Sequence, residues 1–351
     1  MANFQPLYPP PLRPGDRIAV TAPSSGVEPR HHARLDLVLG HLRTRGFAVE
    51  EGRCLRDERD DASAGADERA AELQALLCRD DIAAVIPPWG GERALELLDR
   101  LDWARLAAAR PKWLLGYSDT SSLLLPLTLR LGWATAHGPC LMDLAPGQDD
   151  ALTSRTLEVL ATPAGGAVEQ AASTLHQSQW GDFASDPGCT YRLDRPTRWW
   201  RVDGSDPAAP VQARGRLIGG CLDTLPPLAA GPHAPVRGFI ERCSADGVLL
   251  YLENAELSPT GVLRALHALR WAGWLDGLAA LLIGRSAARE PAGAQHLRHD
   301  DALRQTLGTL PCPVLAGLDI GHVPPQFTLV NGARAEIRFD GRGGTLRQHF
   351  A

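Results

Sequence analysis

The sequence has little of several features that mark specialised classes of protein. Lys112 is its only lysine, its seven cysteines form no C-x-x-C pair, and 36 basic against 41 acidic residues leave a net charge of −5. A small negative net charge does not favour binding to nucleic acid or to anionic lipid, because both are negatively charged. An odd number of scattered cysteines favours neither a disulfide framework nor a thiolate metal site. We therefore expect reduced thiols, no nucleic-acid partner and no membrane partner.

Long apolar runs and cofactor motifs are absent as well. No window has the ~18 uninterrupted apolar residues of a membrane span, and the opening MANFQPLYPPPLRPGD lacks the pattern of a secretory signal. We expect a cytoplasmic protein. Without a G-x-G-x-x-G or Walker motif, the sequence predicts no nucleotide cofactor. The 351 residues, 44% hydrophobic and 22% charged, are typical of a globular protein of about two domains.

Strand and helix patterns alternate along the first part of the chain. This alternation predicts a parallel sheet covered by helices on both faces. The predicted strands cover residues 16–23, 47–50, 82–87 and 113–117, and the predicted helices cover 32–44, 68–77, 94–98 and 121–131.

The pattern breaks down between Ala145 and Ala213, where prolines, glycines and acidic turns predict a linker or an elaborated loop. Periodic elements then resume. We expect strands at 215–219, 248–252 and 278–283, helices near Leu222 and over 260–271, and antiparallel strands over 327–350. The predicted fold class is α/β, with a parallel-sheet, Rossmann-like N-terminal domain (1–150), a linker (151–213) and a mixed α/β C-terminal domain with a β-rich, barrel-like core (214–351).

One serine stands where a predicted strand runs directly into a predicted helix. In KWLLGYSDTSSLLLPL, Ser118 follows the apolar strand, so its hydroxyl would project from a tight turn at the carboxyl edge of the sheet. The helix N-terminus there would favour a developing negative charge. The alternative is an ordinary helix N-cap, which this segment alone favours. The second glycine of the G-x-S-x-G elbow is missing.

A glycine pair closes the preceding predicted strand in IPPWGGERALELL. Gly90 and Gly91 would let backbone N–H groups approach a ligand closely, as an oxyanion hole requires. A plain tight turn explains the pair equally well.

A nucleophilic serine needs a base, and the base needs an orienting carboxylate. His322, in GLDIGHVPPQFTLVNG, follows a predicted strand, and Glu253 closes the strand VLLYLEN with Glu256 as a nearby competitor. Taken singly, each of these residues is better explained by a solvated turn or strand end.

Two histidine pairs could suggest a metal, namely His31 with His32, and His296 with His299 beside Asp300 and Asp301. Neither pair has the ligand set or helical spacing of a zinc hydrolase. We therefore predict no metal site and interpret both pairs as solvated loop faces.

Five segments in order resemble the LD-carboxypeptidase family of serine peptidases, which includes muramoyltetrapeptide carboxypeptidases and microcin C immunity proteins. They extend from about Leu12 to Ile337: LRPGDRIAVTAPSS, PKWLLGYSDTSSL with ATAHGP, RLIGGCLDTL, VLLYLENAE and LDIGHVPPQFTLVNG. The resemblance implies that Ser118 is the nucleophile, His322 the general base and Glu253 its orienting partner. It also implies an oxyanion hole formed by the amides of Gly91 and Asp119, no cofactor or metal, and a homodimer.

The implied reaction is hydrolysis of an L,D-amide, in particular release of the terminal D-alanine of a murein tetrapeptide during cell-wall recycling. One departure is Cys221, where the family usually has asparagine. The long central segment resembles the immunity branch of the family, in which a loop tryptophan stacks on a nucleobase, and Trp180 in QSQWGDF is the candidate beside Gly90 for substrate binding. Hydrolysis of a peptidyl or aminoacyl nucleotide is therefore an alternative, and a noncatalytic small-ligand binding protein is another.

Overall fold

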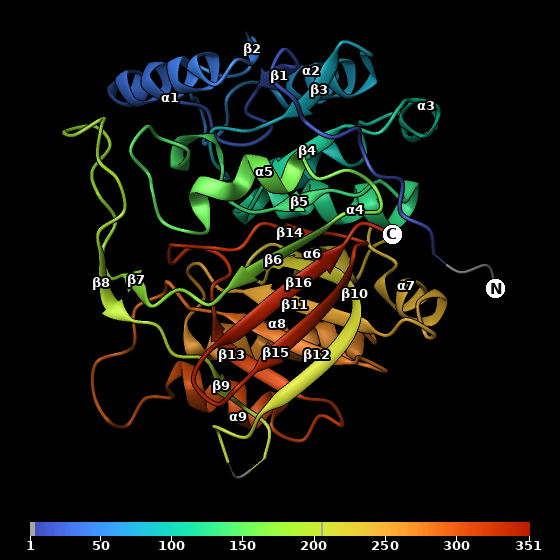
Figure 1. Ribbon diagram of the computed structural model, residues 1–351, viewed down its shortest axis with the longest axis vertical. Helices are drawn as coiled ribbons and strands as arrows, with labels where there is room; N and C mark the ends of the chain where they lie inside the picture. The colour runs from blue at the N-terminus through green and yellow to red at the C-terminus, as the bar shows by residue number, and fades with distance from the viewer. Residues whose placement is uncertain (1–3, 205) are drawn as a thin grey trace.

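The computed structural model describes residues 4–204 and 206–351. Its N-terminal half is built on a six-stranded sheet with the order β14-β5-β4-β3-β1-β2 (Figure 1). All neighbouring pairs among β1 to β5 are parallel, and β14 adds an antiparallel edge. The strands are β1 (Arg17–Val20), β2 (Ala48–Glu51), β3 (Ile82–Val85), β4 (Trp113–Gly116), β5 (Ala136–His137) and β14 (Leu329–Val330).

The helices of this half bear out most of the predicted pattern. Helices α1 (His32–Thr44) and α4 (Ser121–Leu131) have the predicted bounds, and α2 (Ala66–Cys78) is slightly longer than expected. The predicted helix at 94–98 is instead a single 3₁₀ turn, η2 (Ala94–Leu97), and the unpredicted α3 (Trp103–Ala108) follows it. In α1, Leu35, Val38, Leu39 and Leu42 recur at helical spacing and are all buried, which explains why this helix was readable from the sequence.

The C-terminal half is built on an eight-stranded mixed sheet, β6-β16-β15-β10-β11-β12-β13-β9. Strands β10 to β13 are parallel and carry the helices, whereas the pairs beyond them are antiparallel. The expected antiparallel tail is confirmed in β15 and β16. The elements are β10 (Val211–Cys221), α6 (Leu225–Ala229), α7 (Val236–Arg242), β11 (Val248–Glu253), α8 (Pro259–Trp271), β12 (Ala280–Gly284), α9 (His299–Leu307), β13 (Val314–Leu318), β15 (Arg334–Phe339) and β16 (Gly344–His349).

The segment between the two halves has more regular structure than its sequence predicts. It contains α5 (Thr156–Leu160), the edge strands β6 (Ala167–Ala171) and β9 (Trp200–Arg201), and the two-stranded arm of β7 (Leu175–Gln177) and β8 (Leu193–Pro196) (Figure 1). These strands escaped prediction because they carry polar and exposed residues, whereas β1 and β3, which are just as short, are buried apolar runs. Trp199 is fully buried in the core, so part of this segment belongs to the packed fold.

The two halves meet closely beside α4. The Cys221 amide donates a hydrogen bond of 3.0 Å to Ser121 Oγ, which joins the end of β10 to the first turn of α4. At Gly220 (φ +157°) a Cβ would lie 2.7 Å from Ser121 Cβ, so only glycine allows this approach. The carboxyl end of β10 is thereby fixed against the first turn of α4.

Candidate active site

The predicted nucleophile lies on a strained turn. Ser118 directly follows Tyr117 at the end of β4, begins the 3₁₀ turn η3 (Ser118–Thr120) that leads into α4, and has φ +60°. A left-handed conformation costs an L-residue roughly 1–2 kcal/mol, so the surrounding structure must hold it in place. The side chain is partly exposed and lines a cavity of about 750 Å³. This serine is therefore displayed to a ligand rather than used as a simple helix cap.

The carboxylate of the next residue anchors that turn. Asp119 is fully buried and accepts hydrogen bonds from Ser24 Oγ (2.6 Å), the Ala94 amide (2.7 Å) and Ser122 Oγ (3.1 Å). These donors come from three different segments. A buried carboxylate held this way fixes the nucleophile turn against the loops that follow β1 and β3.

The glycine pair packs directly against the serine. A Cβ at Gly90 would lie 2.6 Å from Ser118 Cβ, and one at Gly91 (φ +137°) would lie 2.5 Å from Ser25 Oγ. A side chain at Gly90 would collide with the Ser118 turn, and one at Gly91 would collide with the loop that follows β1. Within the described residues, the N–H groups of Gly91 and Asp119 donate to no other protein group, so both are available to a ligand. The oxyanion hole itself remains a prediction.

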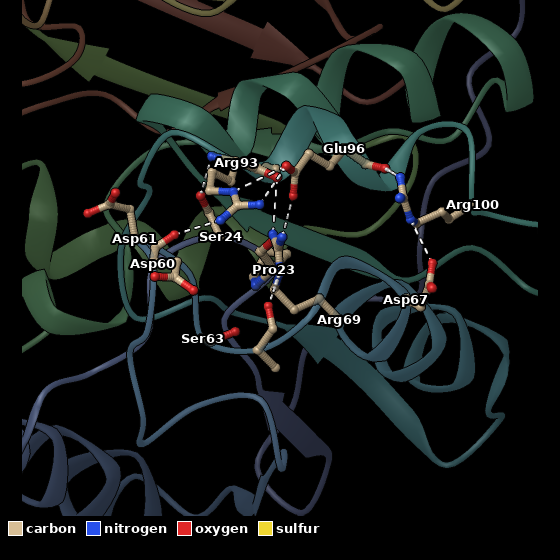
Figure 2. A network of polar contacts seen from close by, with 12 residues as sticks. Pro23, Ser24, Asp60, Asp61, Ser63, Asp67, Arg69, Arg93, Glu96 and Arg100 are labelled. Carbon is tan, nitrogen blue, oxygen red and sulfur yellow. Dashed lines mark hydrogen bonds and ion pairs between the residues drawn. The ribbon is translucent and has the colours of Figure 1, made fainter.

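A charge network around the buried Arg69 supports the loop after the glycine pair (Figure 2). The Arg69 guanidinium, almost wholly buried, donates to the Pro23 carbonyl (2.7 Å) and pairs with Glu96 (2.6 Å). Glu96 also binds Arg93, whose amide donates to Ser24 Oγ at 3.0 Å. This chain of contacts ends at the same serine hydroxyl that binds Asp119, so it stiffens the glycine loop.

The predicted acid and base are paired. Glu253 at the end of β11 and His322 in the loop after β13 are joined by a 2.7 Å contact between Oε2 and Nδ1. Burial alone would lower the pKa of His322, but the Glu253 carboxylate outweighs it and the pKa is raised. Burial would raise the pKa of Glu253, but His322 outweighs it and the pKa is lowered. The pair therefore favours a proton on the imidazole. Glu256, the competitor, forms neither a hydrogen bond nor an ion pair with His322, which pairs with Glu253.

The serine and the histidine face one cavity from opposite domains. Ser118 and His322 both line it, and the ring of Tyr117 lies edge-on to the His322 ring with 4.8 Å between centroids. In the described residues the Ser118 hydroxyl makes no hydrogen bond, so its contact with the imidazole stays a prediction. Such contacts are often loose without a ligand and tighten when substrate binds.

Trp180 reaches the same cavity from the loop between β7 and β8. Its indole Nε1 donates a hydrogen bond of 3.2 Å to the backbone carbonyl of His322, while 43% of the surface of Trp180 stays exposed. Tyr191 packs edge-on against the indole, with 5.7 Å between ring centroids. Trp180 is thus held at the cavity with much of its surface open to a ligand.

Sequence reasoning missed two polar side chains around this site. The Asp223 carboxylate accepts hydrogen bonds from the backbone amides of Ala255, Glu256 and Leu257, and these bonds fix the loop after Glu253. His137 is buried with both ring nitrogens unpaired, and burial lowers its pKa to about 4, so it is neutral behind the site. Both lie in quoted segments, LDTL and TAHGP, but nothing local distinguishes them because their partners are distant in the chain.

The interpretation of both histidine pairs as solvated loop faces is wrong for His32 and for His299. His32 begins α1, is half-buried, and places Nε2 2.9 Å from the carbonyls of Val27 and Arg56. His299 does not lie on a solvated loop face. It begins α9, is 5% exposed, and places Nε2 3.0 Å from the Leu257 carbonyl. The interpretation was wrong because the helix that buries this residue begins at the histidine itself.

The fold and the site define a two-domain α/β protein with a serine, a histidine and a carboxylate gathered where the domains meet. Residues 18–138 match the N-terminal domain of the LD-carboxypeptidases, and residues 214–337 match their C-terminal domain. The chain belongs to the LD-carboxypeptidase family and is a peptide hydrolase.

Several relatives cover most of the chain. A Streptomyces coelicolor protein provisionally named a carboxypeptidase is 34% identical over 95% of this chain and 94% of its own. The Escherichia coli microcin C7 self-immunity protein MccF is 26% identical over 100% and 98%. The murein tetrapeptide carboxypeptidase of Pseudomonas aeruginosa is 33% identical, but over only 35% of this chain and 39% of its own.

Solved structures share the fold. MccF in complex with glutamyl sulfamoyl guanosine superposes with a TM-score of 0.82 at 24% identity, covering 98% of this chain and 99% of that one. The muramoyltetrapeptide carboxypeptidase from Oxalobacter formigenes gives 0.72 at 24% identity, covering 95% and 98%. In the described part of the chain, no helix combines the length and apolar character that crossing a membrane would require.

Proposed function

We propose that this protein is a serine carboxypeptidase that hydrolyses an L,D-amide bond through Ser118, His322 and Glu253. The observation that carries the proposal is the 2.7 Å pairing of Glu253 with His322 on the cavity that Ser118 also lines. An imidazole whose basicity is raised by a buried carboxylate is suited to take a proton from a hydroxyl.

The reaction follows from these positions. Ser118 Oγ attacks the carbonyl carbon while His322 takes its proton, and Glu253 stabilises the resulting imidazolium. The oxyanion is held by the amides of Gly91 and Asp119, and Gly90 keeps the space beside Ser118 open. His322 then gives the proton to the leaving amine. Water attacks the acyl-enzyme by the same route, with His322 as base, and Ser118 is restored.

The substrate class rests on the family. Relatives are named murein tetrapeptide and muramoyltetrapeptide carboxypeptidases, which supports the terminal D-alanine of a murein tetrapeptide as the leaving group. That substrate would place the enzyme in the cytoplasm, in recycling of cell-wall peptide. We also infer a homodimer, which sedimentation of the purified protein tests directly.

Trp180 favours a second candidate, hydrolysis of an aminoacyl nucleotide. Its exposed indole is held at the cavity by the His322 carbonyl, and aromatic stacking on a base contributes roughly 1–3 kcal/mol. The similar MccF structures hold glutamyl sulfamoyl guanosine and aspartyl sulfamoyl adenosine. The same triad would serve both reactions.

One assay separates the candidates. Purified protein is given an L,D-linked tetrapeptide and an aminoacyl sulfamoyl adenosine side by side, and D-alanine and amino acid release are measured. We expect D-alanine release by the wild-type protein and by Ser244→Ala, an exposed control, and none by Ser118→Ala. A Trp180→Ala variant impaired only on the nucleotide would favour the second candidate. Binding without turnover of either compound would indicate a noncatalytic binding protein.

A further inference from the structure

One group of side chains at the site has a composition that the hydrolytic mechanism does not need. Among the described residues, Cys221 Sγ, a Glu253 carboxylate oxygen and a His322 ring nitrogen all lie within 4.8 Å of one another. Thiolate, carboxylate and imidazole are the three ligand types that zinc uses in proteins. Hydrolysis by a serine requires the last two and has no use for a thiol.

The Glu253 carboxylate has spare coordinating capacity. Glu253 is 1% exposed, its Oε2 binds His322, and its Oε1 has no hydrogen bond. An unpaired oxygen at such depth is costly unless something binds it. The Cys221 thiol, also 1% exposed, makes a weak contact of 3.5 Å with Asp223 Oδ2. It also faces the Glu253 carboxylate closely enough that the thiol helps to lower the pKa of Glu253.

A metal ion could reach this group from the cavity. Cys221 and His322 both line the cavity of about 750 Å³ that holds Ser118, whereas Glu253 lines a neighbouring cavity of about 350 Å³. Zinc bonds of about 2.0–2.3 Å set ligand atoms roughly 3.3–3.8 Å apart in a tetrahedron. The most distant of the three ligand atoms therefore need to close by about 1 Å, and the 2.7 Å contact between Glu253 Oε2 and His322 Nδ1 has to open. The fourth position would face the open cavity.

We propose that Cys221, Glu253 and His322 form an inhibitory zinc site. On binding, the Cys221 thiol loses its proton to solvent and the thiolate coordinates Zn²⁺ together with one Glu253 oxygen and one His322 nitrogen. No redox change occurs. The metal binds His322, which would otherwise accept the Ser118 proton, and Glu253, which would otherwise orient His322. Hydrolysis therefore stops until the ion leaves. That zinc inhibits hydrolysis rests on the proposed carboxypeptidase function, whereas the binding of zinc to these three side chains does not.

Cobalt provides the direct test of binding, because a Co²⁺ ion bound by thiolate shows a thiolate-to-cobalt charge-transfer band. The wild-type protein and Ser118→Ala should both show the band, and added Zn²⁺ should abolish it. Losing a partner that merely orients a ligand weakens metal sites by about 10–100-fold, so losing a ligand should weaken this one by at least ~100-fold. We expect that loss in Cys221→Asn and in His322→Ala, and none in Cys78→Ser, a thiol control on α2.

Binding and inhibition are then compared. Zn²⁺ titrated against D-alanine release should inhibit the wild-type protein and Cys78→Ser, and should inhibit Cys221→Asn at least ~100-fold less strongly relative to that variant's own activity. A cobalt band of equal strength in Cys221→Asn or in His322→Ala would overturn the site. If Cys221→Asn does not fold, Cys221→Ser and His322→Ala still decide the question. A band in a protein that hydrolyses no amide would overturn only the proposed function.

Discussion

The two sides of the active site are built in different ways. On the nucleophile side, Ser118 and Asp119 are neighbours in the chain, and a left-handed backbone is held in place by hydrogen bonds from three segments. On the acid–base side, Glu253 and His322 are 69 positions apart and are joined by a single charged contact. The position of the nucleophile therefore depends on backbone geometry, whereas the pairing of the acid and the base depends on charge. Substitutions on the two sides should therefore fail in different ways.

The largest expected effect comes from removing the reacting groups themselves. Ser118→Ala should lower kcat/KM by about 10⁶-fold and Glu253→Gln by about 10⁴-fold, since the nucleophile is indispensable and the acid acts through the base. The Ser118→Ala/Glu253→Gln double variant should be no slower than Ser118→Ala, as measured by D-alanine release. The exposed residue Glu241 supplies the control Glu241→Gln, which should keep full activity. If the double variant lost activity by the product of the two single losses, the two residues would act independently, and that would contradict a shared mechanism.

A smaller loss is expected when only the geometry of the nucleophile side is changed. In Gly90→Ala, the new Cβ would meet Ser118 Cβ at 2.6 Å and displace the turn. Since one misplaced oxyanion donor costs about 10²–10³-fold in kcat, we expect a loss of that size with the Glu253–His322 pair intact. Gly40→Ala is the matched control, because a Cβ there meets nothing within 4 Å. An unchanged kcat in Gly90→Ala would show that the turn is not held tightly.

The buried anchor of the turn should affect stability. Ser24→Ala removes the 2.6 Å hydrogen bond to the fully buried Asp119 carboxylate and leaves part of that charge uncompensated. The expected cost is about 1–3 kcal/mol in the free energy of unfolding, measured by urea denaturation. Ser185→Ala, at an exposed serine, should cost less than ~0.5 kcal/mol. Equal stabilities of the two variants would argue against the anchor.

The smallest effect concerns the strain at Ser118 itself. Glycine adopts φ +60° without the steric cost that alanine pays there. Ser118→Gly should therefore be about 1 kcal/mol more stable than Ser118→Ala, although both are inactive. Thermal unfolding of the two variants measures the difference. A more stable Ser118→Ala would mean that this backbone is not strained.

Much of the fold was readable from the sequence because its longer elements have a clear period. Helices α1 and α4 were predicted with their observed bounds, and the parallel pairing of β1 to β4, though not their order in the sheet, followed from strand and helix alternation. The edge strands β6 and β9 were missed because their buried or half-buried positions include polar side chains such as Gln170 and Arg201, and because their partners lie far along the chain. The pairing of β14 with β5 was missed because these two strands are also far apart in the chain.

The candidate site was predictable to a similar degree. Ser118, Gly90 and Gly91 belong to local turn patterns, and the resemblance to a family selected Glu253 and His322 from many carboxylates and histidines. The structure adds that Glu253 rather than Glu256 meets His322, which spacing alone left open. The roles of Asp119 and Asp223 depend on contacts between distant segments, so no local pattern could reveal their carboxylates as anchors.

The most direct test of the account is covalent labelling of the nucleophile. A fluorophosphonate reacts with a serine only when a neighbouring base activates it, and peptide mass spectrometry locates the adduct. We predict one adduct per chain, on Ser118, that forms in the wild-type protein and in His296→Ala but not in Ser118→Ala or His322→Ala. An adduct on another residue, or equal labelling of Ser118 without His322, would contradict a serine activated by the Glu253–His322 pair.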